Sequence, residues 1–310
     1  MSLAVFSSPR IVCRPALPCD TADVKEFCKF IWDGHDYVQY VWDDWLADPR
    51  GILAVTEYGG RAVGCAKVSR SAPGQWWLHG FRVDPRYQGL KIGSHIHEYI
   101  DAWWLAHGDG VARLMTSSQR LKVHHLCGKL GYAKVMEVRG LTAGPLEEAT
   151  DAFQPLAEAG LPAALEFTLA SPLLAAASGL MDLGWEVIQP TPDILADTIR
   201  AGLAFWWRKR EGLLLAWDDD EAEDKVFGIA LPACSLASLP DLLRDARRLG
   251  ARLGRSSLFW IAPVQDEVLS AAETAGFTKD WEHDGFVYGK WHSVGCGTEL
   301  VKRDLCKKFP

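Results

Sequence analysis

The sequence of 310 residues contains no asparagine, no long hydrophobic run and no closely paired cysteines. Without asparagine, it holds no acceptor site for N-glycosylation. No stretch of about 18 apolar residues occurs, so we expect no membrane partner and no membrane-spanning helix. The N-terminal region also lacks an apolar core followed by a cleavage site, which predicts a cytoplasmic protein. Residues 1–19 carry Arg10 and Arg14 but no acidic residue, and a transit peptide is the alternative.

The cysteines are scattered along the chain and none forms a CxxC motif, which disfavours a zinc site. In a chain of this length we expect reduced thiols, most of them buried, and no bound metal. The eight positions are Cys13, Cys19, Cys28, Cys65, Cys127, Cys234, Cys296 and Cys306.

Basic residues are outnumbered by acidic ones, and the net charge is −7 with an isoelectric point near 5.7. General nucleic-acid binders are usually basic, so no nucleic-acid partner is expected. An anionic ligand must therefore be bound by local charge or by main-chain amides. A hydrophobic fraction of 48% is that of a globular protein, and the chain length predicts two domains.

The first half of the chain predicts a mixed α/β unit. Residues Ile52–Glu57 and Arg61–Ser69 have the composition of strands, and Gly59-Gly60 between them is a hairpin turn. Trp76–Val83 is a third strand, in which Gly80 predicts a bulge. The further expected elements are a helix beginning at Thr21, a helix from near Gly93 to Gly108, a strand at Val111–Thr116, a helix at Val123–Leu130 and a strand at Ala133–Arg139.

The second half repeats the first at an offset of 145 residues, which places Gly131 on Gly276. The same offset places the first long helix on Asp241–Ala251 and the following strand on Ser256–Ala262. A degenerate repeat explains this agreement better than chance does. The loop at 86–93 maps onto 231–238, which has no glycine and no basic residue. We interpret the segment Gly140–Gly160, rich in proline, glycine and acids, as a linker.

A glycine-bearing loop joins the third strand to the long helix, and such a loop at a helix N-terminus can bind phosphate through main-chain amides. The loop reads Gln88-Gly89-Leu90-Lys91-Ile92-Gly93-Ser94. It contains neither the P-loop pattern nor the dinucleotide pattern GxGxxG.

Residues 20–140 resemble the GNAT superfamily of N-acetyltransferases. The resemblance lies in Val83-Asp84-Pro85, in the loop Gln88–Gly93, and in Cys127-Gly128-Lys129-Leu130-Gly131-Tyr132, together with the order of the elements. It implies an acetyl-coenzyme A-dependent enzyme with a tandem GNAT-like α/β fold, whose two domains pack as an intramolecular pseudo-dimer. The implied organisation is an extension at 1–19, an active domain at 20–145, a degenerate copy at 161–292 and a tail at 293–310.

By this resemblance, the strand end and the loop bind the coenzyme. The implied coenzyme-binding residues are Phe81, Arg82, Val83, Gln88, Gly89, Leu90, Lys91, Ile92, Gly93 and Ser94. Lys91 replaces a glycine of the family motif, so we expect αR or β geometry there. Its side chain either adds a cation at the pyrophosphate or projects into solvent.

Two residues are candidates for proton transfer. His79 is the candidate base, on the same face as Phe81 by period-2 alternation, since imidazole titrates near neutral pH. Arylalkylamine N-acetyltransferases, to which this stretch is similar, also have a histidine there; a core histidine is the alternative. Cys127 stands where the family has the tyrosine that protonates the leaving thiolate, and a thiol pKa of ~8.5 would suit that role. A buried core thiol is the alternative.

The stretch Trp32–Tyr37 most resembles histidine N-acetyltransferases, which also have a C-terminal extension of this size. It implies a small acceptor amine, such as free histidine, bound by Asp33, His35, Asp36 and Tyr37. A solvated acidic turn is the alternative. An acceptor carboxylate would need an arginine, and Arg82, Arg113, Arg120 and Arg139 all remain open. The competing functions are a sensor that binds acyl-coenzyme A or an amino acid, and an acetyltransferase acting on proteins or peptides.

Overall fold

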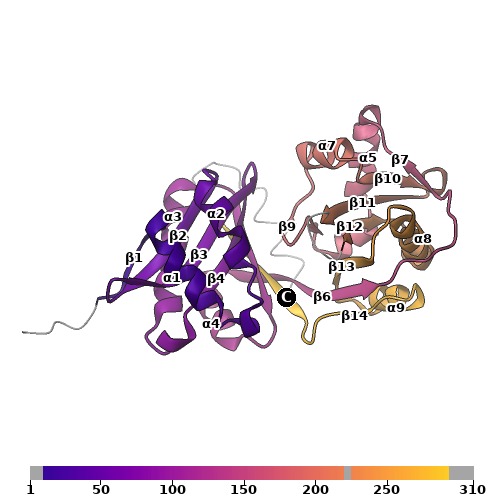
Figure 1. The fold of residues 1–310 in the computed structure, drawn as a ribbon. Coiled ribbons are helices and arrows are strands. Elements are labelled where there is room, and N and C mark those ends of the chain that lie inside the picture. The colour runs from indigo at the N-terminus through magenta and orange to yellow at the C-terminus, as the bar shows by residue number, and fades with distance from the viewer. Residues whose placement is uncertain (1–9, 220–224, 293–310) are drawn as a thin grey trace, which may run out of the picture.

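The computed structural model describes residues 10–219 and 225–292. Figure 1 shows two lobes bridged by β6 (Ala133–Ala143) and β15 (Gly285–Trp291). One mixed sheet of 13 strands runs through both lobes, in the order β1-β2-β3-β4-β5-β15-β6-β13-β12-β11-β10-β7, with β14 paired to β6. In the part of the chain described, no helix is long and apolar enough to cross a membrane.

The N-terminal lobe buries its sheet on both faces. Successive residues of a strand point to opposite faces. Accordingly, Ile52 and Ala54 pack in one apolar cluster with α3 and α4, whereas Leu53 and Val55 pack in another with α1 and α2. The elements of this lobe are β1 (Val12–Pro15), α1 (Thr21–Cys28), α2 (Val38–Ala47), β2 (Gly51–Tyr58), β3 (Arg61–Ala72), β4 (Gln75–Val83), α3 (Ile92–His107), β5 (Val111–Ser117) and α4 (Leu121–Lys129). The strands and helices expected from the sequence are confirmed, most of them with ends shifted by one to three residues.

The second lobe has the same arrangement around its own sheet. Trp206 and Trp207 are neighbours on β10, and they face opposite sides: Trp206 contacts Phe167 of α5, and Trp207 donates a hydrogen bond to Asp245 of α8. Its elements are β7 (Phe153–Pro155), α5 (Leu161–Leu169), α6 (Pro172–Ala176), β8 (Met181–Asp182), β9 (Val187–Ile188), α7 (Pro192–Arg200), β10 (Ala204–Trp207), β11 (Gly212–Asp219), β12 (Val226–Ala233), α8 (Leu239–Arg252), β13 (Ser257–Pro263), α9 (Asp266–Thr274) and β14 (Thr278–Lys279). The expected tandem α/β fold is therefore confirmed.

Two details of the sequence interpretation are wrong. The offset of 145 carries the loop 86–93 onto residues 231–238, but Leu231–Ala233 belong to β12. The actual connection from β12 to α8 is shorter than its counterpart, so an ungapped offset cannot align the two loops. The segment Gly140–Gly160 is also not a simple linker, because its first residues complete β6 and Phe153–Pro155 form β7.

The described cysteines are free thiols. Cys28, Cys65, Cys127 and Cys234 are buried, Cys13 is half-buried, and Cys19 is exposed. Cys296 and Cys306 lie outside the described residues.

Each lobe completes its sheet with a strand from the other half of the chain. β15 follows the last helix of the second half, yet it lies between β5 and β6 of the first lobe. In return, β6 continues past Val138, and its residues Arg139–Ala143 pair with β13 of the second lobe. Removing either strand would leave the neighbouring strands with unpaired main-chain groups.

Where the chain crosses between the lobes, Arg139 of β6 meets Asp284, the residue before β15, and both side chains are partly buried. Two hydrogen bonds join them, Nε to Oδ1 at 2.7 Å and one terminal nitrogen to Oδ2 at 2.8 Å. These two residues are 145 positions apart, the offset of the repeat, so they are equivalent positions in the two halves. The Arg139 guanidinium beside Asp284 lowers the pKa of that carboxyl.

We expect Asp284→Ala to lower the free energy of unfolding by about 1–2 kcal/mol, because a bidentate, largely buried pair is lost. The matched control is Asp43→Ala, whose partner Lys25 is exposed and whose loss should cost at most about 0.5 kcal/mol. Urea denaturation measures both.

The destabilisation caused by Asp284→Ala should depend on pH. A carboxyl with a lowered pKa stabilises the folded state above its ordinary pKa of ~4, and this contribution is lost as the pH falls through the lowered value. The difference between Asp284→Ala and the unsubstituted protein should therefore shrink in acid. A difference that is absent at neutral pH contradicts the assigned role of the pair.

Candidate functional site

The central strands of the N-terminal lobe part from each other. β4 and β5 are paired in parallel only at Gln75–Trp77 and Val111–Arg113. Beyond this point β4 continues to Val83 and β5 to Ser117. The facing edges diverge, and their main-chain groups face a wedge rather than a partner strand. An extended ligand with amide groups can lie along such edges.

A bulge in β4 follows directly. The register with β3 shifts between Cys65 and Lys67, and Gly80 has a φ of +64°. A Cβ at Gly80 would lie 2.5 Å from the ring of Trp45, so both the conformation and the space require glycine. The bulge predicted from the sequence is confirmed.

The same bulge corrects the placement of His79. Alternation alone puts His79 and Phe81 on one face of the sheet, but the extra residue in β4 turns Phe81 to the other face. The Phe81 ring lies 4.7 Å from His97 of α3, whereas the His79 ring lies 4.7 Å from Trp45 of α2. His79 and Phe81 therefore face opposite sides of the sheet.

The loop between β4 and α3 presents a row of free donors. The main-chain N–H groups of Gly89, Leu90, Lys91, Ile92 and Gly93 make no hydrogen bond within the described residues. The loop is exposed from Gln88 to Lys91, and α3 begins at Ile92, where the positive end of its dipole adds to the donors. Asp84 fixes the start of the loop by accepting from Arg86 N and from the Arg86 guanidinium. This arrangement suits a phosphate or pyrophosphate group.

Lys91 departs from the expected conformation. Its φ of +61° and ψ of +17° lie in the left-handed region, not in αR or β geometry. The chain thus keeps the backbone that glycine would adopt and accepts the strain of a side chain there. The Lys91 side chain is exposed beside the free N–H groups.

Other predicted coenzyme-binding residues differ in what they can offer. The Arg82 side chain points to the α1–α2 face, where it forms a bidentate pair with Asp36 at 2.7 and 2.8 Å. Only its main chain remains for a ligand. Val83 packs against α3 near Gly93, and Ile92 is buried against Gly64. Ser94 is half-buried in the first turn of α3.

Cys127 lies in the apolar cluster beneath α3 and α4 and is fully buried. Burial raises the pKa of its thiol to about 12. The expected match to a coenzyme thiol near ~8.5 is therefore wrong, since proton transfer from Cys127 would be unfavourable by a factor of about 10³. One turn earlier on α4, His124 Nδ1 lies 3.0 Å from the hydroxyl of Tyr288, which the exchanged strand β15 supplies.

On the opposite face, a cavity of about 270 Å³ adjoins His79. It is lined by Asp44, Trp45, Asp48, Arg50, Ser69, Arg70, Ser71, His79 and Glu186. His79 Nε2 lies 3.1 Å from Ser69 Oγ. Burial and the nearby Lys67 cation lower the pKa of His79 to about 3, so the imidazole is neutral at physiological pH.

The ionised groups of this cavity are partly paired. Lys67 is fully buried and its Nζ lies 3.1 Å from Asp48 Oδ2. Burial alone would raise the pKa of Asp48, but hydrogen bonds from Arg50 and Lys67 outweigh it and lower the value to about 2. Burial raises the pKa of Glu186.

The predicted acceptor-binding residues Asp33, His35, Asp36 and Tyr37 do not line this cavity. Asp36 is fully buried in its pair with Arg82, and Asp33 and His35 are exposed. The Tyr37 ring contacts Trp45 at 6.0 Å and so touches the cavity wall indirectly. These roles stay predictions.

Three of the four candidate arginines have settled partners. Arg82 pairs with Asp36, and Arg139 pairs with Asp284. Arg113 is buried at the lobe interface and donates to Gln75 Oε1, while Arg120 is exposed.

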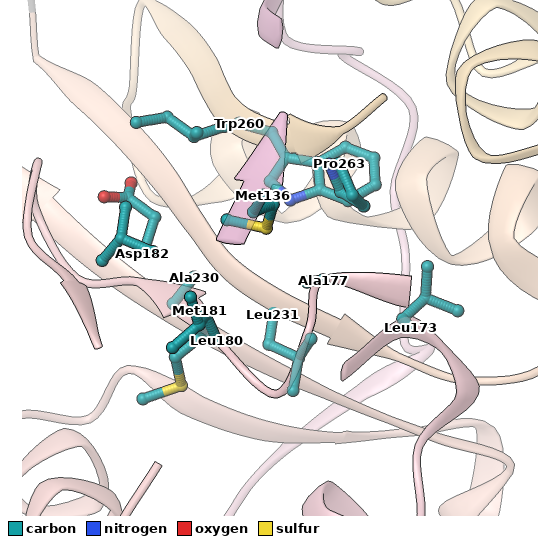
Figure 2. Close-up of a pocket in the computed structure, with 12 residues that line it drawn as sticks. Met136, Leu173, Ala177, Leu180, Met181, Asp182, Ala230, Leu231, Trp260 and Pro263 are labelled. Carbon is teal, nitrogen blue, oxygen red and sulfur yellow. The ribbon is translucent and has the colours of Figure 1, made fainter. Parts of the chain in front are cut away.

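The equivalent wedge of the second lobe is filled by the chain itself. β12 and β13 pair in parallel only up to Ile229 and Trp260. Figure 2 shows mostly apolar side chains lining the small space beside these strands, among them Leu173 of α6, Met181 of β8, Leu231 of β12 and Trp260 of β13. About 10 Å³ of space remains, which is at the lower limit for one water molecule.

The sequence did not indicate Glu186, the cavity residue supplied by the second half. It lies between β8 and β9, in a hairpin with no local motif. Ser69 was also missed; it lies diagonally across from His79, whose direct partner on β3 is Lys67. Among the described residues, no group of histidine, cysteine and acidic side chains could hold a metal ion.

Residues 21–132 match the family model described as Acetyltransferase (GNAT) family. No curated protein matches the chain. The family match and the fold together support an acyltransferase enzyme.

Several solved structures share the fold over nearly the whole chain. A GCN5-related N-acetyltransferase from Sphaerobacter thermophilus is 14% identical with a TM-score of 0.63, over 94% of this chain and 98% of that chain. A tandem GNAT protein from the clavulanic acid biosynthesis pathway is 9% identical with a TM-score of 0.57, over 93% and 100%. A glucosamine N-acetyltransferase region of a fungal multi-domain β-N-acetylglucosaminidase is 14% identical with a TM-score of 0.62, over 92% and 38%.

The strain at Lys91 predicts that Lys91→Gly stabilises the fold by about 1 kcal/mol, since glycine adopts positive φ freely. Lys91→Ala removes the same charge but keeps the strain, so it should change stability by only a few tenths of a kcal/mol. Thermal unfolding compares the two variants. Calorimetric titration with acetyl-coenzyme A then measures the contribution of the Lys91 charge to binding. Both variants lack the ammonium, so a loss of affinity that they share, relative to the unsubstituted protein, is due to the charge. Lys91→Gly that is no more stable than Lys91→Ala contradicts the strained geometry.

Proposed function

We propose that the protein is an N-acetyltransferase that moves an acetyl group from acetyl-coenzyme A to the amine of a small acceptor, a free amino acid such as histidine. The observation that carries the proposal is the row of free main-chain N–H groups at residues 89–93, beside the wedge between β4 and β5. Free donors at a helix start suit the pyrophosphate, and diverging strand edges suit the amide-bearing arm of the coenzyme.

In this proposal the active domain comprises residues 20–145 and the degenerate copy residues 161–292, packed as a pseudo-dimer. The reciprocal exchange of β6 and β15 supports such packing. The filled wedge of the second lobe supports one coenzyme site, located in the first lobe.

The acceptor is assigned to the cavity beside His79. Its wall combines the acidic residues Asp44, Asp48 and Glu186 with two arginines, Arg50 and Arg70. An amino acid carries both an ammonium and a carboxylate, and groups of both signs in one cavity suit it. The volume of about 270 Å³ fits a molecule of that size better than a polypeptide segment.

His79 as the base stays a prediction, and the proton transfer that this role requires is unfavourable. An imidazole with a pKa of about 3 would take a proton from an amine of pKa ~8–10 against a factor of at least about 10⁵. A neutral His79 can instead orient an acceptor by hydrogen bonding, with Ser69 holding the ring.

The second candidate function is a sensor that binds an acyl-coenzyme A without turnover. The burial of Cys127, where the family motif implies a tyrosine proton donor, favours it. Turnover separates the two functions.

We expect the purified protein to release coenzyme A thiol from acetyl-coenzyme A when a small amine is added. A thiol-trapping assay should be run over amino acids, including histidine, with glucosamine and a basic peptide as comparison acceptors. Turnover that is fastest with a free amino acid confirms the proposal. Binding of acetyl-coenzyme A without turnover on any acceptor would support the sensor, and preference for the peptide would indicate a protein acetyltransferase.

A further inference from the structure

The second half of the chain reaches into the acceptor cavity at one point. Glu186 lies in the turn between β8 and β9, and among the described residues it is the cavity-lining side chain that comes from beyond β6. The other lining residues belong to α2, the segment that follows it, β3 and β4. The cavity is therefore complete only when both halves are present.

The hairpin that carries Glu186 is fixed on both sides. Asp182, at its start, accepts hydrogen bonds from Trp217 Nε1 and from Trp185 N, both at 2.9 Å. Gln189, just after its end, exchanges two hydrogen bonds with Gln75 of β4, at 2.7 and 2.9 Å. The main chain that carries Glu186 is thus held in place before any ligand binds, which lowers the entropic cost of using its side chain.

Among the described residues, the Glu186 carboxyl has a neighbouring hydroxyl but no ion-pair partner. No ion pair among residues 10–219 and 225–292 includes it, whereas Asp48 is paired with Lys67 and Arg50. Ser71 lines the same cavity, close enough to Glu186 that its hydroxyl lowers the pKa of that carboxyl, although burial outweighs this effect. The charged and titratable groups that face this part of the cavity are Asp44 and Asp48 from the α2 side, Arg50, Arg70 from β3, His79 from β4, and the buried Lys67 behind Asp48.

We propose that Glu186 is the catalytic base, the group that receives a proton from the ammonium of the acceptor. This inference rests on the proposed function and assigns part of the active site to the second half. Glu186 takes one proton, and the free amine attacks the thioester carbonyl. The C–N bond forms, the C–S bond breaks, and its electron pair leaves with sulfur. A second amine proton ends on that sulfur, and Glu186 returns its proton to water at the cavity mouth, where Asp44, Arg50 and Arg70 are exposed.

Glu186 suits the role better than the alternatives in the same cavity. Burial raises the pKa of Glu186, which strengthens it as a base. Asp48 has its pKa lowered to about 2, and His79 to about 3, so both are weaker proton acceptors.

The test is the pH dependence of kcat/KM for Glu186→Gln with the best amine of the panel and acetyl-coenzyme A. Near pH 7 we expect a loss of about 10²- to 10⁴-fold. The loss should narrow as the pH approaches the pKa of the amine, because the acceptor then arrives unprotonated. A merely structural role would lower the rate by the same factor at every pH. Glu282→Gln is the matched control, because its side chain is 87% exposed and should leave the rate unchanged.

Further measurements separate a loss of catalysis from a loss of folding. Circular dichroism and acetyl-coenzyme A titration establish whether Glu186→Gln is folded. If it is not, Glu186→Asp takes its place and should retain the pH dependence at a reduced rate. A loss that is equal at all pH values, or no loss, overturns the assignment. If kcat/KM is normal in Glu186→Gln but falls in a pH-dependent way in His79→Ala, the base is His79 and not Glu186. No turnover in the unsubstituted protein overturns the proposed function, and the assignment with it.

Discussion

The pairing of β6 and β15 across the two halves is the interaction on which the rest of the structure depends. β15 lies between β5 and β6, so the edge of β5 that faces away from β4 is paired with a strand at least 168 residues away in sequence (285 − 117). With β5 held there, its other edge can diverge from β4 without opening the sheet. The Arg139–Asp284 pair fixes the place at which the two strands cross. The wedge in the first lobe is thus supported by the second half of the chain.

The two halves share a fold but differ in what occupies the wedge. In the first lobe, the loop before α3 has glycines, free N–H groups and a strained Lys91. In the second lobe, the corresponding connection is shorter, and α6 and β8 fill the gap with apolar side chains. The segment that fills the gap continues into the hairpin of Glu186. In the proposed function, the same stretch of chain therefore fills the wedge of the second lobe and contributes to the acceptor cavity of the first.

Much of this could be predicted from the sequence because the signals are local. Alternating and helical hydrophobic patterns located most elements, and Gly80 indicated the bulge. The effect of the bulge on its neighbours was not predicted: one extra residue places His79 and Phe81 on opposite faces of the sheet. Lys91 kept a left-handed backbone that its residue type disfavours, because the loop around it requires that geometry. The strand exchange and Glu186 depend on contacts across more than 100 residues, which no local pattern encodes.

We propose that this tandem fold holds a single acyl-coenzyme A site, in the wedge and loop of the first lobe. Calorimetric titration of the full chain with acetyl-coenzyme A measures the stoichiometry directly. We expect one molecule of acetyl-coenzyme A to bind per chain. Two molecules per chain, or no heat of binding at all, would contradict it.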